Sequence, residues 1–233
     1  EQYGLVTGDG IRRIDLKSLN NVRIKNERLL CFYNSIIYNG KVLSNDTYKD
    51  ESKVKYYDVN ELIAAKEGEA PAVTELDIIQ KQKINFVLAK DGNVYTLESA
   101  DNGCNIVKIK NDFTLEKVFA NFQPAKGPYH SSPTIGMVAS ETENIIYLVS
   151  TDGAIYKYIL GDSDSLKAPF IAAESGVSIT APLQLNQQSG ELYVTYTEER
   201  KDESKIVVYS KDGKVLHTVD CGESVPSQIL FNN

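Results

Sequence analysis

The sequence predicts an all-β protein, a five-bladed β-propeller with four antiparallel strands in each blade. Short apolar alternations dominate the chain, and long amphipathic helical patterns are nearly absent. Asn, Asp and Gly bound these alternations, as they commonly do between strands. The same succession of strands returns five times over 233 residues. Four strands per unit and a period of this size are typical of a propeller, which we expect to form a single domain over residues 1–233.

One segment of each unit carries the repeat most clearly. It opens with Ile or Val and places Ile or Tyr three residues later. The five copies are "IRRI" (11–14), "VKYY" (54–57), "IVKI" (106–109), "IYKY" (155–158) and "IVVY" (206–209). Another strand precedes each copy: "YGLVT", "KVLSN", "NVYTL", "IIYLV" and "ELYVTY". Turn signals such as "TDG" (151–153) separate the two strands in most units, so we interpret them as the second and third strands of a blade.

A further strand lies upstream of these two and forms the inner strand. The copies are "SIIY", "INFVLA", "TIGMVA" and "APLQL". Asn39-Gly40 and Asp91-Gly92 follow the first two copies, and such pairs favour type I′ hairpin turns because both central residues need a positive φ. A more polar fourth strand completes each unit, for example "TLEKVFA" and "GKVLHTV".

The last inner strand, "SQILF" (227–231), has no partner after it, and the chain begins with a second strand that has no inner strand before it. Joined, the ends read "QILFNN/EQYGLVTGDG", which is similar to "FVLAKDGNVYTLES". We therefore expect the C-terminal strand to complete the first blade, with Leu230 near Leu5, because an open ring would leave a sheet edge unpaired. The alternatives are a two-sheet sandwich or an excerpt from a longer propeller.

The inner strands also carry a resemblance to a known family. "GESVPSQILF" (222–231), "SSPTIGMV" (131–138) and "SITAPLQL" (178–185) each place a Pro just before an apolar strand. This pattern resembles the YVTN-type bacterial propellers of the wider WD40-like superfamily, and the resemblance implies the same fold. The chain departs from the pattern in two ways: it has no Trp, and the first two blades lack the Pro.

Local signals predict one helix and free thiols. In "NELIAAKEG", Asn60 is placed to cap a short helix that ends at Ala64–Ala65, before Gly68 and Pro71. Cys31, Cys104 and Cys221 show no metal-ligand spacing. We interpret them as reduced thiols, with a Cys31–Cys221 disulfide as the alternative.

Composition excludes some classes of partner. A net charge of -7 and a pI near 5.0 argue against a nucleic-acid groove, which needs a concentrated basic face. No run of about 18 apolar residues is present, so no membrane-spanning segment is expected. The chain starts without Met or a leader, and we expect a monomer that is exported to the periplasm or cell surface after removal of its signal.

Residues for catalysis are not grouped in the sequence. A glycosidase needs two carboxyl groups, one with a raised pKa, and the predicted inner strands hold no Asp or Glu. Glu174 and Glu223 lie on loops that lead into inner strands, and we interpret both as surface residues. His130 and His217 are the only histidines, and no "GxSxG" or "GxGxxG" pattern occurs. We therefore expect no cofactor and no metal site, with "GDSDS" (161–165) read as a polar turn.

One loop is a candidate binding site. "FQPAKGPYHSSP" (122–133) is the longest loop leading into an inner strand, and its three prolines reduce the cost of ordering it on binding. The candidate residues are Lys126, Tyr129, His130, Ser131 and Ser132. Alternatively, the loop packs over the mouth of the channel that runs through the centre of a propeller, and Tyr129 plugs it. We predict a non-catalytic module that binds a peptide, glycan or partner protein here; the alternative is a glycosidase- or lyase-type enzyme with carboxylates supplied by loops.

Overall fold

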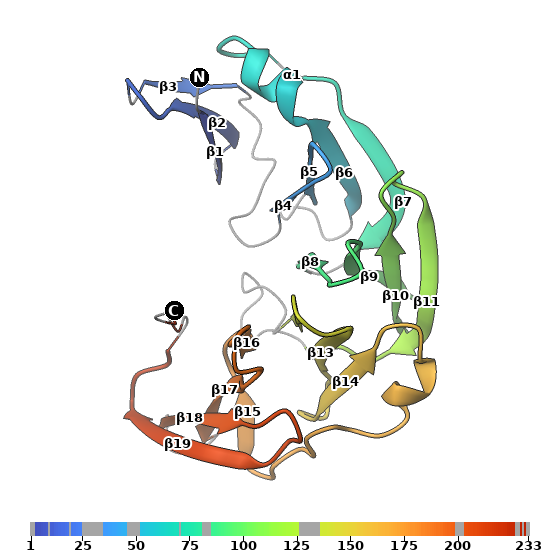
Figure 1. Ribbon diagram of the computed structural model, residues 1–233, viewed down its shortest axis with the longest axis vertical. Helices are drawn as coiled ribbons and strands as arrows, with labels where there is room; N and C mark the ends of the chain where they lie inside the picture. Colours follow the sequence, from blue (N-terminus) through green and yellow to red (C-terminus); the bar gives the residue numbers. More distant parts are fainter. Residues whose placement is uncertain are drawn as a thin grey trace.

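Five antiparallel sheets follow one another along the chain, and we number them first to fifth in chain order. The computed structural model describes residues 3–8, 10–18, 20–24, 35–45, 52–69, 71–80, 85–125, 136–198, 203–226, 229 and 231. The sheets stand around a common centre, with β4, β8 and β16 nearest to it and β7, β11 and β19 on the outside (Figure 1). This all-β arrangement agrees with the predicted fold class.

The first and second sheets contain the N-terminal third of the strands. The first sheet has β1 (Tyr3–Gly8), β2 (Gly10–Asp15) and β3 (Asn21–Arg23). The second sheet has β4 (Ser35–Tyr38), β5 (Lys41–Ser44), β6 (Ser52–Asp58) and β7 (Thr74–Gln80). Between β6 and β7 lies the helix α1 (Val59–Ala64).

The remaining sheets repeat the same antiparallel order. The third sheet has β8 (Val87–Leu88), β9 (Val94–Ala100), β10 (Gly103–Ile109) and β11 (Leu115–Phe122). The fourth sheet has β12 (Met137–Ala139), β13 (Ile145–Val149) and β14 (Ile155–Ile159), followed by the short helix η1 (Ser163–Leu166). The fifth sheet has β15 (Val177–Ile179), β16 (Gln184–Leu185), β17 (Leu192–Glu198), β18 (Ser204–Tyr209) and β19 (Val215–Gly222).

The predicted succession of inner, second, third and fourth strands is confirmed in the second and third sheets, where strands adjacent in sequence pair in the order β4-β5-β6-β7 and β8-β9-β10-β11. In the fourth sheet a single bridge between Ile155 and Ile171 follows β14 in place of a regular fourth strand. The fifth sheet has an additional short strand, β15. Both β15 and β16 pair with β17, β16 with its first residues and β15 with its last.

Alternating strand directions give each sheet two distinct ends. We call the end that carries the β8–β9 and β10–β11 turns, at Gly92 and Asn111, the turn end. The opposite end carries the β9–β10 turn at Gly103 and the residue Ala125 that follows β11, and we call it the loop end. In a meander of four strands, the connection from one sheet to the next therefore leaves from the loop end.

The closure of the first blade is not confirmed. The first sheet has three strands, and none of the sheets is closed within the part of the chain that the structure describes. Ile229 and Phe231 lie outside the strands, and Leu230 is outside the described residues. The backbone N–H of Ile229 donates to Oε1 of Gln184 at 2.7 Å, and the Phe231 ring packs on Tyr193 with centroids 5.0 Å apart. The described C-terminal residues thus contact the fifth sheet.

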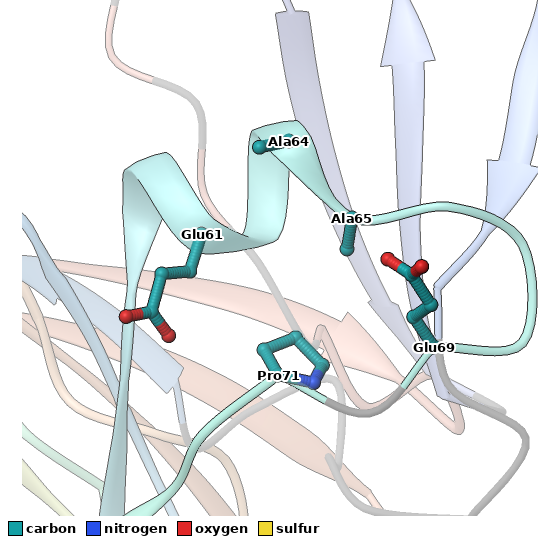
Figure 2. Close-up of a pocket in the computed structure, with 5 residues that line it drawn as sticks. All are labelled: Glu61, Ala64, Ala65, Glu69 and Pro71. Atoms are coloured by element: carbon teal, nitrogen blue, oxygen red, sulfur yellow. The ribbon is translucent and has the colours of Figure 1, made fainter.

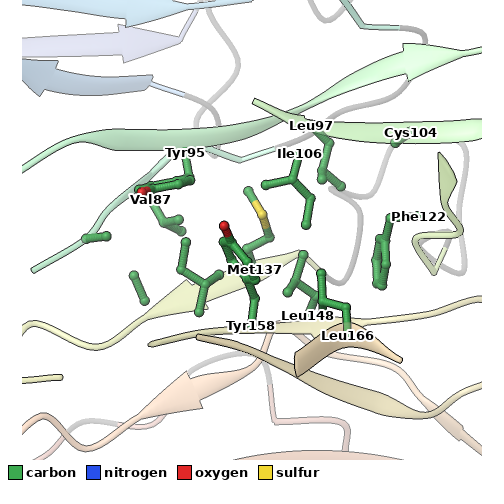
Figure 3. Close-up of a cluster of buried hydrophobic side chains, with 13 residues drawn as sticks. Val87, Tyr95, Leu97, Cys104, Ile106, Phe122, Met137, Leu148, Tyr158 and Leu166 are labelled. Carbon is green, nitrogen blue, oxygen red and sulfur yellow. The ribbon is translucent and has the colours of Figure 1, made fainter. Parts of the chain in front are cut away.

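The core consists of apolar clusters between neighbouring sheets. Figure 3 shows the cluster between the third and fourth sheets, where Met137 lies among side chains from both. Similar clusters join the second sheet to the third and the fourth to the fifth. The sequence also predicts that five tyrosines at strand positions fill the space between blades: Tyr95, Tyr147, Tyr158, Tyr193 and Tyr209. Four of them are buried, whereas Tyr193 is only partly buried.

Two local predictions need correction. The helix α1 is capped by Asp58, whose side chain accepts from the backbone N–H of Asn60 and Glu61, so the cap lies two residues before the predicted Asn60. Asn39 and Gly40 both have positive φ, at 46° and 73°, as a type I′ turn requires. At Asp91-Gly92 only the glycine has positive φ, and the predicted type I′ turn is wrong there.

Candidate functional site

The binding residues predicted from the sequence all lie outside the described residues: Lys126, Tyr129, His130, Ser131 and Ser132. The segment 126–135 connects β11 to β12, so its two described neighbours are Ala125 and Gly136. The structure therefore shows how the two ends of the candidate loop are held, and this is the part of the site that can be built from its contacts.

The N-terminal end of the loop is held by the fourth sheet. The backbone N–H of Ala125 donates to the carbonyl of Val149 at 2.8 Å, and Thr151 N–H donates to the carbonyl of Gln123 at 2.9 Å. Pro124 and Ser150 form the bridge between these two bonds. Residues from the third sheet are thus paired with the end of β13, which fixes where the candidate loop begins.

The C-terminal end is held by the third sheet. Asn85 precedes β8, and its Nδ2 donates to the carbonyl of Met137 at 2.7 Å while its Oδ1 accepts from Met137 N–H at 3.1 Å. The carboxamide therefore pairs with the first residue of β12 in the way a neighbouring strand would. Because both polar groups of the backbone are satisfied, β12 starts in a defined register.

A chain of buried polar side chains supports Asn85. Gln80 Nε2 donates to Thr96 Oγ1 at 2.9 Å and to the carbonyl of Leu97 at 3.0 Å, and Thr96 Oγ1 donates to the carbonyl of Asn85 at 3.2 Å. Asn45 Nδ2 donates to Gln80 Oε1. Gln80 and Thr96 are 1% and 0% exposed. This chain links the second, third and fourth sheets at the loop end, and buried networks whose members are paired make the local structure rigid.

Sequence reasoning missed this polar chain. Asn45 and Asn85 flank strands, where Asn is an ordinary turn residue, and Gln80 closes a strand whose other polar positions are exposed. The one available signal is that Gln80 follows Ile78 at the spacing of one face of a strand, which places it on the buried side.

The carboxylates and histidine considered for catalysis lie at the surface. Glu174 pairs with Lys205 at 3.1 Å, and its side chain is 52% exposed. Glu223 is exposed in the turn after β19, and His217 is exposed on that strand. Among the described residues, no three His, Cys, Asp or Glu side chains are grouped to hold a metal ion.

Six described carboxyl groups have a shifted pKa, and every shift is downward: Asp15, Asp58, Asp91, Asp112, Glu116 and Asp152. At Asp58 the pKa is lowered mainly by the hydrogen bond from Lys41. At Asp91 burial is the largest single influence and raises the pKa, but hydrogen bonds from Lys108, Asn93 and Tyr95 together outweigh it. All six groups are thus ionised at neutral pH and serve turns or ion pairs.

Two shallow hollows lie at the turn end of the sheets. The first, about 360 Å³, is lined by Glu61, Ala64, Ala65, Glu69 and Pro71 beside α1. In Figure 2 the Pro71 ring lies between the carboxylates of Glu61 and Glu69. The second, about 420 Å³, lies at the third sheet and is lined by Asn93, Lys108, Lys110, Asn111 and Asp112. The first lies at the connection between the third and fourth strands of its sheet, and the second lies between the β8–β9 and β10–β11 turns, so both are at the opposite end of the sheets from Ala125.

The described thiols are free. Cys104 is buried, and desolvation raises its pKa to about 11. Cys221 is partly exposed. The structure gives no support to the alternative Cys31–Cys221 disulfide, since Cys221 is free and Cys31 lies outside the described residues. The helices of the described residues, α1 and η1, have six and four residues and are too short to cross a membrane.

Solved structures similar to this chain are propeller-like. A prolyl oligopeptidase B from Galerina marginata superposes with a TM-score of 0.58 at 12% identity, over 93% of this chain and 32% of that chain. A puromycin hydrolase gives a TM-score of 0.58 at 13% identity, over 95% and 35%. A streptogramin B lyase gives 0.45 at 14% identity, over 90% and 61%. This chain thus spans about a third of the first two proteins and less than two thirds of the third.

At these identities the likeness concerns the fold alone. The first two superpositions confirm a propeller-like all-β architecture, whereas the YVTN-type and WD40-like labels are not confirmed. The comparison with curated proteins found no match. One family matches over residues 1–232, nearly the whole chain. The chain therefore belongs to the family described as "Domain of unknown function (DUF5074)".

Proposed function

We propose that this protein is a non-catalytic binding or scaffold module that engages a peptide, a glycan or a partner protein through the segment 126–132. The observation that carries this proposal is that the chain is held on both sides of that segment, by Val149 at Ala125 and by Asn85 at Met137. Pro128 and Pro133 lie between these two held residues, and prolines reduce the conformational freedom that a loop loses when it binds.

The alternative, a glycosidase- or lyase-type enzyme, is less well supported by the described carboxyl groups. A glycosidase needs one carboxylic acid with a raised pKa. The six shifted groups are all lowered, and Glu174, the loop carboxylate considered for this role, is paired with Lys205.

The test uses binding with matched variants. A glycan array and a pull-down from extracellular protein would be repeated with Tyr129→Ala and His130→Ala, and with His217→Ala as a control on the exposed outer strand. We expect one or both loop variants to lose about tenfold in affinity, as for a lost contact of about 1.4 kcal/mol, while His217→Ala binds normally. Unchanged binding by both loop variants would remove this segment from the site.

We also propose that the ring has five blades and that residues 227–231 complete the first. Asn85 lies just before the inner strand β8, and its side chain accepts from the backbone N–H of Met137. Gln184 lies in the inner strand β16, and its side chain accepts in the same way from the backbone N–H of Ile229. Ile229 therefore lies beside the fifth sheet as Met137 lies beside the third. The backbone amides of β1 should exchange hydrogen more slowly in the full chain than in a chain that lacks residues 227–233. Equal exchange rates in the two chains would exclude the closure.

The localisation, the oligomeric state and the excluded partners are proposed from the amino-acid sequence. We propose an exported monomer that binds neither nucleic acid nor a cofactor. Fractionation of cells that express the full reading frame tests the location, and sedimentation of the purified chain tests the monomer. Recovery of the protein in the cytosol, or of a stable dimer, would contradict the respective part.

A further inference from the structure

Four turns of this protein share one backbone geometry. In each, the N–H of the fourth residue donates to the carbonyl of the first, and the N–H of the first residue donates to the carbonyl of the fifth. The four turns are 89–93, 110–114, 150–154 and 210–214. Three have glycine at the fourth position, Gly92, Gly153 and Gly213, with φ of 75°, 83° and 77°. The other has Phe113, with φ of 64°.

A bulky residue in the left-handed region is strained, and such strain persists only where surrounding contacts enforce it. The Phe113 ring packs on Tyr56 with centroids 4.6 Å apart and meets Tyr38 edge-on at 5.9 Å. Both tyrosines belong to the second sheet, so the side chain ties this turn of the third sheet to its neighbour. Glycine could not make this contact.

Further bonds hold the same turn. The Tyr38 hydroxyl lies 2.7 Å from Oδ1 of Asn111 and 3.0 Å from the carbonyl of Gly92, and Asn39 Nδ2 donates to the carbonyl of Asn111 at 2.8 Å. Asn111 and its neighbour Asp112 line the hollow of about 420 Å³. The wall of this hollow is therefore held in place before any ligand arrives, which lowers the entropic cost of binding.

The groups around the hollow are both donors and acceptors. Lys108 is held by Asp91 at 2.9 Å and Lys110 by Glu116 at 2.9 Å, and each ammonium has further N–H groups to donate. Oδ1 of Asp112 accepts hydrogen bonds from the backbone N–H and the hydroxyl of Thr114, and its Oδ2 has no hydrogen-bond partner among the described residues. Nδ2 of Asn111 is likewise without a partner in the described part of the chain. The charges nearly cancel, because each lysine has an acidic neighbour.

This chemistry fits a hydroxyl-rich ligand. A hydroxyl both donates and accepts, so an array of ammonium, carboxamide and carboxylate groups can pair with several hydroxyls of one sugar. A strongly anionic ligand would be opposed by Asp91, Asp112 and Glu116, and the lining residues offer no apolar side chain to an aliphatic ligand. A volume of this size lies within the range of small-molecule sites.

We propose that the hollow between the β8–β9 and β10–β11 turns is a carbohydrate-binding site for a short neutral glycan. The site lies at the turn end of the third sheet, at the opposite end from Ala125, and does not depend on the function proposed for the segment 126–132. Phe113, Tyr38 and Asn39 are its positioning residues, and Lys108, Lys110, Asn111 and Asp112 contact the sugar.

The test is a titration of the full chain with maltotriose, cellotriose, xylotriose and trigalacturonate at millimolar concentration, followed by amide NMR. We expect at least one neutral trisaccharide to shift the side-chain amide signals of Asn93 and Asn111. Lys110→Met with Asp112→Asn, which keeps the Oδ1 acceptor for Thr114, should weaken that binding about tenfold through the loss of one or two hydrogen bonds.

The matching turn of the fifth sheet supplies the control, because Lys211→Met with Asp212→Asn changes the same residue types without touching the hollow. This control variant should bind as the parent does, and thermal unfolding should show that both variants fold. The proposal is overturned if no neutral trisaccharide shifts these signals, if trigalacturonate alone does, or if the Lys110/Asp112 variant binds as tightly as the parent. Loss of binding at Tyr129 would bear only on the other site.

Discussion

Asn85 and Met137 lie on neighbouring sheets, and the side chain of one pairs with the backbone of the other through two hydrogen bonds of 2.7 and 3.1 Å. Gln187 makes a similar pair, accepting from Glu141 N–H at 2.8 Å and donating to the carbonyl of Ala139 at 3.0 Å. Both carboxamides thus form hydrogen bonds with the backbone of β12, that of Asn85 from the third sheet and that of Gln187 from the fifth. Adjacent sheets are joined by polar pairs as well as by apolar packing.

Replacing Asn85 by alanine should destabilise the protein by about 2 kcal/mol, because both backbone groups of Met137 lose their partner. Urea unfolding measures this change. Asn102→Ala is the control, since Asn102 is exposed and bonds through its backbone carbonyl; it should change stability by less than about 0.5 kcal/mol. Equal effects of the two substitutions would mean that the Asn85–Met137 pair contributes nothing.

Phe113→Gly should destabilise the protein less than Phe113→Ala, although glycine removes more of the side chain. Both variants lose the contact with Tyr56, but only glycine relieves the positive φ, a difference of about 1 kcal/mol. Gly92→Ala introduces the same backbone strain at an equivalent position, because the φ of Gly92 is 75°. An added Cβ would meet nothing within 4 Å there, so the expected loss of stability, about 1 kcal/mol, comes from backbone strain alone. Calorimetric melting of the three variants measures these effects. If Phe113 were unstrained, Phe113→Gly would destabilise the protein more than Phe113→Ala.

Stability should be constant between about pH 7 and 5 and fall below about pH 4. The six shifted carboxyl groups have folded pKa values below their unfolded values, so their contribution is present above the unfolded pKa and is lost as the pH falls through the folded one. Melting temperatures at several pH values check this. Asp91→Asn should make the acid limb shallower, because Lys108 and Tyr95 then lose a charged acceptor; an acid limb of unchanged slope would count against this assignment.

Thiol labelling should distinguish the two described cysteines. Burial raises the pKa of Cys104 to about 11, so at about pH 8 its reactive thiolate is scarce and sheltered, whereas Cys221 is partly exposed. In a Cys31→Ser background, a thiol reagent should modify Cys221 promptly and Cys104 only when denaturant is added. Mass spectrometry locates the label, and rapid labelling of Cys104 in the folded protein would show that the third sheet opens readily.

Strand order could be predicted because hairpin turns leave a strong local pattern. Alternating apolar residues bounded by Asp, Asn and Gly gave the inner, second and third strands of the second to fourth sheets. The capping of α1 by Asp58 could not be found this way. Asp58 ends β6 with extended backbone angles, and the cap of a helix has extended angles too, so one residue serves both elements.

The candidate sites were less predictable, because they depend on contacts between sheets. Asn85 and Gln80 meet their partners only once the second, third and fourth sheets pack together. In the sequence Phe113 looks like an ordinary apolar residue at the end of a polar turn. Its positive φ becomes evident only when the turn is compared with the equivalent turns, which have glycine at this position. The residues of the loop 126–132 stay a prediction.

The sheets consist of strands that are consecutive in sequence, and each described contact between sheets joins nearest neighbours around the centre. An assembly of this kind behaves like a linear chain of coupled units, in which the cost of separating two units is set at their shared boundary. We therefore expect a molecule pulled by its two ends first to lose the proposed pairing of residues 227–231 with the first sheet. It should then yield in steps, one sheet after another, with the greatest resistance where Asn85 and Gln187 hold β12 from both sides.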